Sequence, residues 1–310
     1  MRGLASAGWA FCLLLLAATA QAAPATQSSA FVVPAFAKAL QGCWRQDGNG
    51  GTSLRFDGQR LLFAADGRFK AAAGIVRYEP NRIVVRLYGQ KDVRPWAIKG
   101  GRLVIRHSDR GTQRYQRLAN VPPELELAPL PLGEAKPLEA DKVAGIQKEL
   151  ARRLEADQAV RRDAARAKEM AKVDAENTAY VRKVLGELGW IDAGRFGAEA
   201  SQAAFLLVQH SGDLPLMLAA LAPIEQDVKA KRLRDAQPYA LLFDRTRLLL
   251  GEKQRYGTQI GSDAKGNPVV LPLEDRQKVE EFRKEIGLFP LSKYMAAFGK
   301  EVKFMDDGDE

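Results

Sequence analysis

The spacing of apolar residues changes once along this chain, at a segment rich in proline. Before residue 120, apolar residues recur at every second position in short runs, which is the period of a strand with one buried face. After residue 142 they recur every three or four positions, which is the period of a helix. Five prolines between 120 and 138 predict a stiff, extended linker. The sequence therefore predicts an α+β protein, with a β domain at 38–119, a linker at 120–142 and a mainly helical domain at 143–303.

The β domain is predicted to be an antiparallel meander that closes into a barrel. Turn signals such as Asp57-Gly58, Asp66-Gly67, Gly100-Gly101 and Asp109-Arg110-Gly111 separate its apolar runs. With about eight strands, closure removes the exposed edges of the sheet. The predicted runs are Leu54 to Phe56, Leu61 to Ala64, Phe69 to Ala72, Ile75 to Tyr78, Ile83 to Tyr88, Pro95 to Lys99, Leu103 to His107 and Gln113 to Leu118.

The same domain carries most of the positive charge. Between Trp44 and Leu118 there are 16 Lys and Arg against 6 Asp and Glu, whereas the formal net charge of the whole chain is +9. This excess favours an anionic neighbour such as lipid headgroups or an envelope glycan; no specific nucleic-acid partner is predicted. The alternative is an arginine-rich, solvated sheet face, because charge balance affects solubility first.

Residues 1–23 have the features of a secretory signal peptide. Arg2 precedes an apolar run from Trp9 to Ala20, and Ala20-Gln21-Ala22 offers a cleavage site. The run is shorter than the roughly 20 residues that span a bilayer. Once Cys12 is removed, Cys43 has no partner for an intramolecular disulfide. We therefore expect a periplasmic or secreted protein.

The helical domain is predicted to contain a small β hairpin as well as helices. The hairpin pairs 254–260 with 268–271 around a turn at 263–266. The first helix has an apolar stripe of Ile146, Leu150 and Leu154. Further helices are predicted at 173–188, 196–209, 214–229, 239–250, 274–286 and 292–298.

Polar residues occupy positions on these helices where apolar ones are expected. The first stripe continues to Asp157 and Arg161, which can pair because they lie four residues apart. The stripe of the helix at 196–209 continues to His210, where the helix dipole favours an imidazolium. Asp213 follows three residues later. We therefore expect His210 to titrate, to bind an anion, or to complete a hydrogen-bond network.

A second polar group follows in an apolar context. Asp244 and Arg245 interrupt the run from Tyr239 to Leu250, and buried charges need partners because desolvating an unpaired ion costs several kcal/mol. The segment from Gln254 to Gln259 follows. As a strand it would show Gln254, Tyr256 and Thr258 on one side. These residues either complete a structural network or line a cavity.

The usual motifs of metal and cofactor sites are missing from the sequence. Two histidines, His107 and His210, and one usable cysteine argue against a zinc site. There is no P-loop, dinucleotide fingerprint or nucleophile elbow. The sequence therefore predicts no metal and no cofactor, and any enzyme here would use His210, carboxylates and amides.

Gly42-Cys43-Trp44 opens the predicted meander and Arg114-Tyr115-Gln116-Arg117 ends it. With these two segments the β domain resembles lipocalin-like, or calycin, barrels. In that family the tryptophan of a G-x-W motif packs against an arginine from a late strand. The resemblance implies that Trp44 is structural and that the barrel is either filled or binds a small apolar ligand. The cysteine pairing of many lipocalins is missing here.

Five motifs follow one another through the helical domain. They are Asp157, Gln158 and Arg161; Gly189-Trp190; Gln209, His210 and Asp213; Asp244-Arg245; and Gln254 with Tyr256 to Gln259. With these motifs, the chain from about Val143 to Lys300 resembles a bacterial family known only as a domain of unknown function. It departs from the family pattern at Ile191-Asp192, where a proline is common, and at Ser211-Gly212, where a small residue and an acid are expected. The resemblance supplies no activity, but it implies that the motif residues belong together.

Three functional hypotheses follow. As an enzyme, the helical domain would use His210 as general acid or base, with Asp213 or Asp244 orienting it. As a binding module, the same residues would form a polar pocket without turnover. As a structural protein, they would form a buried network while the basic barrel docks to an anionic surface. The residues predicted to bind a polar or anionic small molecule or glycan are Asp157, Gln158, Arg161, Gln209, Arg245, Gln254, Tyr256, Thr258 and Gln259.

Overall fold

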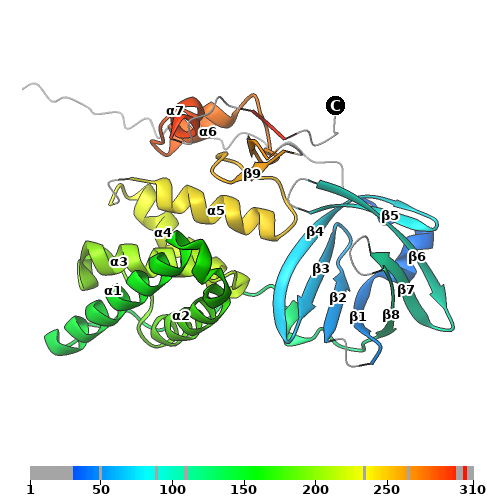
Figure 1. Ribbon diagram of the computed structural model, residues 1–310, viewed down its shortest axis with the longest axis horizontal. Helices are drawn as coiled ribbons and strands as arrows, with labels where there is room; N and C mark the ends of the chain where they lie inside the picture. The colour runs from blue at the N-terminus through cyan, green and yellow to red at the C-terminus, as the bar shows by residue number, and fades with distance from the viewer. Residues whose placement is uncertain are drawn as a thin grey trace, which may run out of the picture. The chain divides into compact units, whose positions relative to one another are not determined.

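Alternating apolar residues fold the N-terminal half of the chain into a closed barrel of antiparallel strands (Figure 1). The computed structural model describes residues 31–48, 51–87, 90–107, 111–232, 235–263, 266–297 and 303–305. The predicted signal peptide lies outside these described residues. The strands are β1 Gly42–Gln46, β2 Thr52–Phe56, β3 Arg60–Ala65, β4 Arg68–Glu79, β5 Arg82–Leu87, β6 Gln90–Lys99, β7 Arg102–His107 and β8 Gly111–Arg117.

The strands differ in several ways from the predicted runs. The barrel includes β1, which was not among them, and the two runs predicted at 69–72 and 75–78 form the single strand β4. β4 pairs with β3 up to Gly74 and with β5 from Gly74 onward. The strand therefore continues through Gly74 and changes its pairing partner there, without a turn. The number of strands was therefore correct although several boundaries were wrong, as at β6, which begins at Gln90 and not at Pro95. The turn signal predicted around Asp109 falls on residues 108–110, outside the described part of the chain.

The contact between tryptophan and arginine that the lipocalin resemblance implies is present in the barrel. The 3-10 helix η1, Ala35–Leu40, precedes β1, and Trp44 Nε1 donates a hydrogen bond to the Leu40 carbonyl at 2.8 Å. The Arg117 guanidinium lies 4.2 Å from the centre of the Trp44 ring. Arg117 also donates to the Gln41 carbonyl at 2.8 Å. Trp44 is thus a structural residue, and the barrel fits the lipocalin-like architecture loosely.

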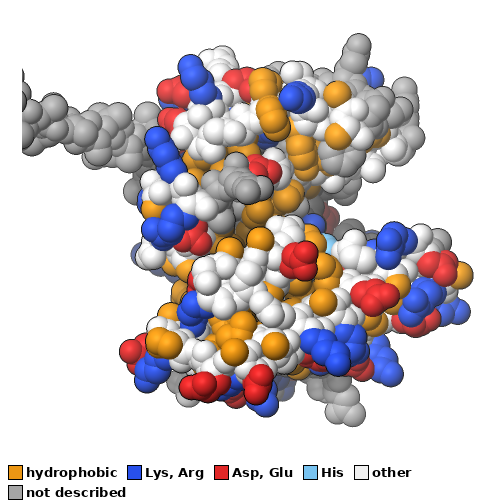
Figure 2. Space-filling view, turned by 90° about the vertical axis from the view of Figure 1, so that its left-hand side faces the viewer, with side chains coloured by type: hydrophobic (Ala, Val, Ile, Leu, Met, Phe, Trp, Pro, Cys, Tyr) orange, Lys and Arg blue, Asp and Glu red, His pale blue; other side chains and the backbone are white. Residues whose placement is uncertain are grey.

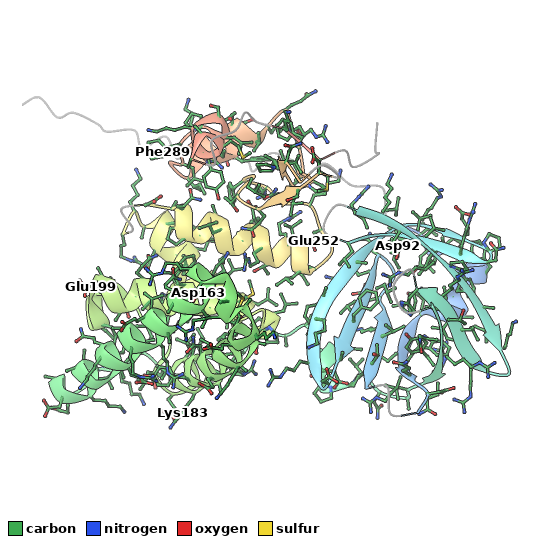
Figure 3. All side chains as sticks on the ribbon, in the orientation of Figure 1. Asp92, Asp163, Lys183, Glu199, Glu252 and Phe289 are labelled. Carbon is green, nitrogen blue, oxygen red and sulfur yellow. The ribbon has the colours of Figure 1, made fainter. Side chains whose placement is uncertain are left out.

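Buried side chains from the strands lie inside the barrel (Figure 3). Most are apolar, but His107 and Tyr115 are also buried, and His107 Nε2 lies 2.8 Å from the Tyr115 hydroxyl. Arg94 is buried against Phe63 and pairs with Asp92 at 2.8 Å. Pairing of this kind offsets the cost of desolvating a charge in the barrel.

The proline-rich segment packs against the rest of the chain at several points. It contains a short 3-10 helix η2, Pro123–Leu125, and Leu125 is fully buried beside barrel residues such as Leu62. Further along, the amide of Leu130 donates to Pro215 at 2.8 Å and that of Gly133 donates to Leu185 at 2.9 Å. The leucines between the prolines therefore anchor this segment against both neighbouring parts of the chain.

Seven α-helices and a small hairpin make up the described C-terminal part (Figure 1). α1 packs against α2 and α3, and α4 packs against α5, around one apolar core. None of the described helices is long and apolar enough to cross a membrane. The elements are α1 Ala140–Arg162, η3 Ala164–Arg166, α2 Ala167–Leu188, α3 Ala193–His210, α4 Leu214–Lys229, α5 Gln237–Leu249, β9 Ile260–Ser262, β10 Pro268–Val270, α6 Val279–Glu285 and α7 Leu291–Ala296.

The described structure confirms the α+β fold class, with a closed antiparallel barrel followed by helices and a hairpin. Several predicted boundaries were wrong. Helix α2 begins at Ala167 and not at 173. Helix α6 begins at Val279 and not at 274, because Asp275 Oδ1 accepts hydrogen bonds from the amides of Gln277 and Lys278 in a turn. The hairpin begins at Ile260, and the preceding segment from Gln254 to Gln259 is a loop.

Two glycines bring β4 close to the turn after α5. A Cβ atom on Gly74 would lie 2.4 Å from the carbonyl oxygen of Gly251, and one on Gly251 would lie 2.4 Å from the amide nitrogen of Gly74. Only glycine allows so close a backbone approach. Residues Val33–Glu310 form one compact unit, and this contact is part of it.

Candidate functional site

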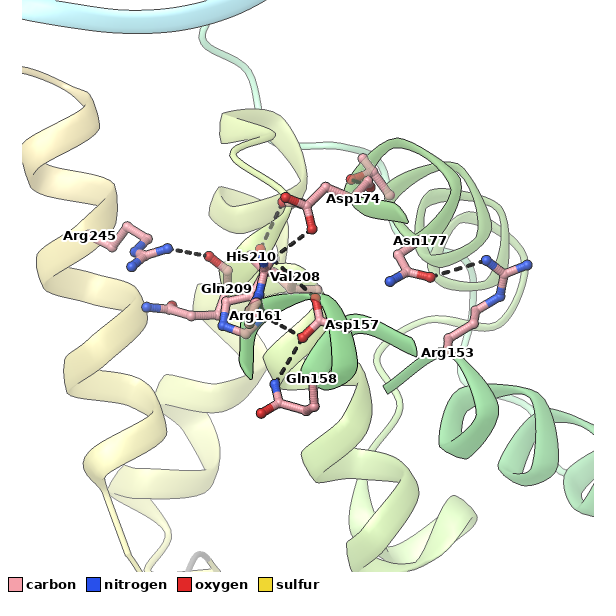
Figure 4. A network of polar contacts seen from close by, with 12 residues as sticks. Arg153, Asp157, Gln158, Arg161, Asp174, Asn177, Val208, Gln209, His210 and Arg245 are labelled. Carbon is pink, nitrogen blue, oxygen red and sulfur yellow. Dashed lines mark hydrogen bonds and ion pairs between the residues drawn. The ribbon is translucent and has the colours of Figure 1, made fainter. Parts of the chain in front are cut away.

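A buried carboxylate on α1 is the centre of the polar site (Figure 4). The apolar stripe of α1 places Asp157 toward the core, where it is 0% exposed. Its Oδ2 lies 2.9 Å from His210 Nδ1 and accepts a hydrogen bond from Gln158 Nε2, also at 2.9 Å. Its Oδ1 forms an ion pair with Arg161 Nη2 at 3.1 Å. The predicted pairing of Asp157 with Arg161 is therefore confirmed.

His210 is the last residue of α3 and receives two different partners at one ring nitrogen. Asp157 Oδ2 approaches Nδ1 at 2.9 Å, and Arg161 Nε approaches the same nitrogen at 3.0 Å. The carboxylate only accepts and the guanidinium only donates. Nδ1 with a proton therefore bonds Asp157, and Nδ1 without one bonds Arg161.

The other ring nitrogen of His210, Nε2, is not used in the contacts with Asp157 and Arg161. No described residue makes a hydrogen bond to Nε2, and the side chain is 21% exposed. Nε2 is an acceptor when Nδ1 carries the proton and a donor in the opposite tautomer. The site can thus present either a base or an acid at the same atom.

Arg161 extends the network to α2. Its Nη2 donates to Asp174 Oδ1 at 2.6 Å, so one guanidinium bridges carboxylates of α1 and α2. Asp174 was not among the predicted site residues. The buried stripe of α2 includes Val184, Val181 and Asn177, and one further step of three residues toward the N-terminus reaches Asp174. Helical periodicity could therefore have found it.

The two carboxylates beside Arg161 differ electrostatically. Burial opposes ionisation of Asp157, but its hydrogen bond and attraction to His210, with help from Arg161 and Gln158, lower its pKa below the usual value. For Asp174, burial dominates over the attraction of Arg161 and raises the pKa. Asp157 is consequently the permanent negative partner of His210 at neutral pH.

Asp244 lies in a separate cage and does not contact His210. It is 0% exposed, and its Oδ1 accepts from the amides of Arg255 and Tyr256 at 2.8 and 3.0 Å. Its Oδ2 accepts from the amide and the hydroxyl of Thr258, both at 2.9 Å. Burial raises the pKa of Asp244, and these hydrogen bonds to the ionised form oppose the rise.

This cage explains why the segment from Gln254 to Gln259 is not a strand. Amides of the segment bond to one carboxylate, so the backbone curls around Asp244 instead of pairing along its length. Gln254 is also buried and completes the loop: its Nε2 donates to the carbonyls of Gln259 and Leu271 at 3.0 and 2.8 Å, and its Oε1 accepts from the Gln259 amide at 2.8 Å. Gln254 and Thr258 use their polar groups to hold this loop.

Tyr256 packs as a core residue within the same loop. Its ring lies 6.1 Å from that of Tyr239 and 5.5 Å from that of Phe243, both edge to face. Its carbonyl accepts a hydrogen bond from buried Arg283. Arg283 was not predicted from the sequence, where it lies in an ordinary charged helix.

Arg245 connects the loop to the helix that carries His210. It donates to the Gln209 carbonyl at 2.8 Å and, through Nε, to Gln259 Oε1 at 3.3 Å. Gln209 itself has a buried Oε1 that accepts no hydrogen bond from the described residues. The predicted residues thus form two clusters, one at His210 and one at Asp244, joined by Arg245.

The carboxylate that contacts His210 is Asp157, and not Asp213 or Asp244 as predicted. Asp213 caps α4 by accepting from the Leu216 amide at 3.1 Å, and it pairs with Arg182 at 2.6 Å. The intervening Ser211 and Gly212 turn the chain between α3 and α4, which directs Asp213 toward α2. Sequence proximity to His210 suggested the wrong carboxylate.

No group of three or more His, Cys, Asp or Glu side chains that could hold a metal ion occurs among the described residues. The arrangement at His210 instead fits proton transfer. A histidine held through one nitrogen by a buried carboxylate, with the other nitrogen available, is the arrangement used for general acid–base catalysis.

The fold and the site together define an α+β protein with a closed antiparallel barrel and a helical domain that holds an Asp-His-Arg cluster. Residues 144–303 match the family of unknown function DUF6624. The chain belongs to this family, and the match covers all helices from α2 to α7 and most of α1. No curated protein and no solved structure matches the chain.

Proposed function

We propose that the helical domain binds a polar or anionic small molecule or glycan at His210 and transfers protons through His210 Nε2. The observation that supports this is the contact of Nδ1 with buried Asp157 at 2.9 Å, which leaves Nε2 with no partner among the described residues. Hydrolysis or group transfer is the reaction class, with His210 as the general acid or base and Arg161 beside it as a cation for an anionic group.

Diethyl pyrocarbonate tests this role because it acylates accessible, unprotonated imidazole nitrogens. His210 is expected to react rapidly in the native protein, whereas His107 is buried and its Nε2 bonds Tyr115. Mass spectrometry of peptides resolves the two sites. Asp157→Asn should slow acylation of His210 several-fold, since it removes the carboxylate that holds the proton on Nδ1.

The matched control for this labelling is Asp213→Asn. It neutralises another carboxylate close to the end of α3, and asparagine can still cap α4. Acylation in this variant should equal that of the unsubstituted protein. Equal rates in all three proteins, or a native His210 that resists the reagent, would defeat the proposed acid–base role.

A structural role is the second candidate, and the Asp244 cage favours it for part of the motif residues. Asp244, Gln254 and Thr258 make hydrogen bonds within the protein and hold the loop that ends at Gln259. We assign these three to positioning the loop and Arg245, while substrate contact is reserved for residues around His210. The motif of the family then combines a site with the scaffold that supports it.

We also propose that the protein is exported and acts in the cell envelope or outside it. The apolar run near the N-terminus and the Ala20-Gln21-Ala22 cleavage signal support this. The mature protein should begin near Ala23 or Pro24. Mass spectrometry of the protein recovered from a cell envelope fraction measures this directly, and a chain that retains Met1 to Ala22 would contradict export through this signal.

The barrel supplies a further candidate contact with anionic surfaces. Some of its arginines are neutralised locally, as in the pairs of Arg45 with Glu124 at 3.1 Å and of Arg60 with Asp57 at 2.7 Å. Any docking therefore relies on the remaining cations, and it should weaken as salt is raised. Retention on anionic vesicles that persists at high salt would contradict electrostatic docking.

A further inference from the structure

A cleft of about 630 Å³ lies beside the His210 cluster. Its helical wall includes Asp174 and Arg182 of α2 and Ser211, the residue that follows His210. Opposite lies the start of β4, with Arg68, Phe69 and Lys70. Asp174 connects the cleft to the site, because it bonds Arg161, which in turn contacts His210. His210 does not itself line the cleft, but Ser211, its neighbour in the chain, and Asp174, the partner of Arg161, do.

The charges that line the cleft are not balanced. Each of its three carboxylates has a cationic partner: Asp174 pairs with Arg161 at 2.6 Å, Asp213 with Arg182 at 2.6 Å and Glu124 with Arg45 at 3.1 Å. Arg68 and Lys70 also line the cleft, and no described residue forms an ion pair or hydrogen bond with either side chain. Arg68 and Lys70 are thus two cations of the lining that have no charged or hydrogen-bonding partner among the described residues.

Both cations are exposed at the start of β4. Lys70 has no partner in the register of β3 and β4, where Phe63 lies opposite Ala71 and Ala64 lies opposite Phe69, so Lys70 stands at a bulge in the strand. Phe69, between the two cations, packs against the apolar cores. Phe69 thus anchors the strand while Arg68 and Lys70 remain in the solvent at the cleft.

We propose that this cleft binds an oxyanion group of the substrate through Arg68 and Lys70. The ligand class is a small molecule or glycan that bears a phosphate or a carboxylate, since a guanidinium fork and an ammonium bind such groups by charge-assisted hydrogen bonds. This inference rests on the proposed function, to which it adds the substrate class. It also gives the barrel a role in the site of the helical domain.

Calorimetric titration of the full chain at low salt tests the proposal, with inorganic pyrophosphate and citrate as separate probes. The unsubstituted protein should bind at least one of these probes. The probe with the higher affinity shows whether the site takes a phosphate or a carboxylate. The double variant Arg68→Glu, Lys70→Glu should weaken that binding by about ten-fold or more, because two charge-assisted contacts are replaced by repulsion.

The matched control is Lys99→Glu with Arg106→Glu. These residues are exposed on β6 and β7 of the same barrel, outside the cleft, and no described residue pairs with their side chains. The control makes the same change in net charge and should bind the probe nearly as well as the unsubstituted chain. The proposed site would be overturned if both double variants lost the same affinity for the probe, or if neither lost any. It would also be overturned if the unsubstituted chain bound neither probe.

Comparing the titration with the acylation of His210 in the unsubstituted chain separates this inference from the proposed function. Probe binding together with an unreactive native His210 would leave the anion site standing and defeat only the acid–base role. Rapid acylation of His210 without probe binding would leave the acid–base role standing and overturn only the anion site.

Discussion

Replacing Asp244 by alanine should destabilise the protein by about 3–5 kcal/mol. The substitution removes a fully buried carboxylate that accepts four hydrogen bonds, three from amides and one from the Thr258 hydroxyl. Those donors would remain buried without an acceptor, and each such group costs roughly 1–3 kcal/mol. Chemical denaturation followed by circular dichroism measures the change in the free energy of unfolding.

Asp227→Ala is a suitable control for this loss of a carboxylate. Asp227 lies on α4 and pairs with exposed Arg232 at 2.7 Å. Losing that surface pair should cost less than about 1 kcal/mol. If Asp244→Ala were as mild as the control, the loop at 254–259 would be held by its other contacts, and Asp244 would not be the residue that positions it.

The fold of the helical part was largely predictable because its signals are local. The apolar stripe of α1 gave the inward position of Asp157, and Pro215 in the first turn after Asp213 marks the beginning of α4. The barrel strands were harder to predict. A long strand such as β4, which changes its pairing partner at Gly74, looks like two strands when only alternation is considered.

The partners within the site were less predictable than its members. Helical periodicity placed both Asp157 and His210 inward, but it carries no information on which inward residues of different helices meet. Asp213 is three residues from His210 in sequence and pairs elsewhere, whereas Asp157 is 53 residues away and contacts it. The alternation of Gln254, Tyr256 and Thr258 suggested a strand. The sequence does not show that Asp244 binds the amides of Tyr256 and Thr258, which bends this segment into a loop.

The two partners of His210 Nδ1 lead to the second large effect, a change of imidazole tautomer in opposite directions. Asp157 stabilises the form with the proton on Nδ1, and Arg161 stabilises the form with the proton on Nε2. Asp157→Asn should therefore shift His210 toward the Nε2-protonated form. Arg161→Lys keeps the positive charge between Asp157 and Asp174 but loses the Nε donor, so it should shift His210 toward the Nδ1-protonated form.

Nitrogen-15 NMR of the imidazole rings distinguishes the two tautomers without any knowledge of the substrate. The chain has only two histidines, so a His107→Gln variant assigns both sets of signals. His107 serves as the internal reference because its contact with Tyr115 is remote in sequence from either substitution and should not change. If His210 kept the same tautomer in both variants as in the unsubstituted protein, Asp157 and Arg161 would not control the position of its proton. Opposite shifts would establish that one histidine is poised to give or to take a proton at Nε2, as one residue must when it serves as both acid and base in a single reaction cycle.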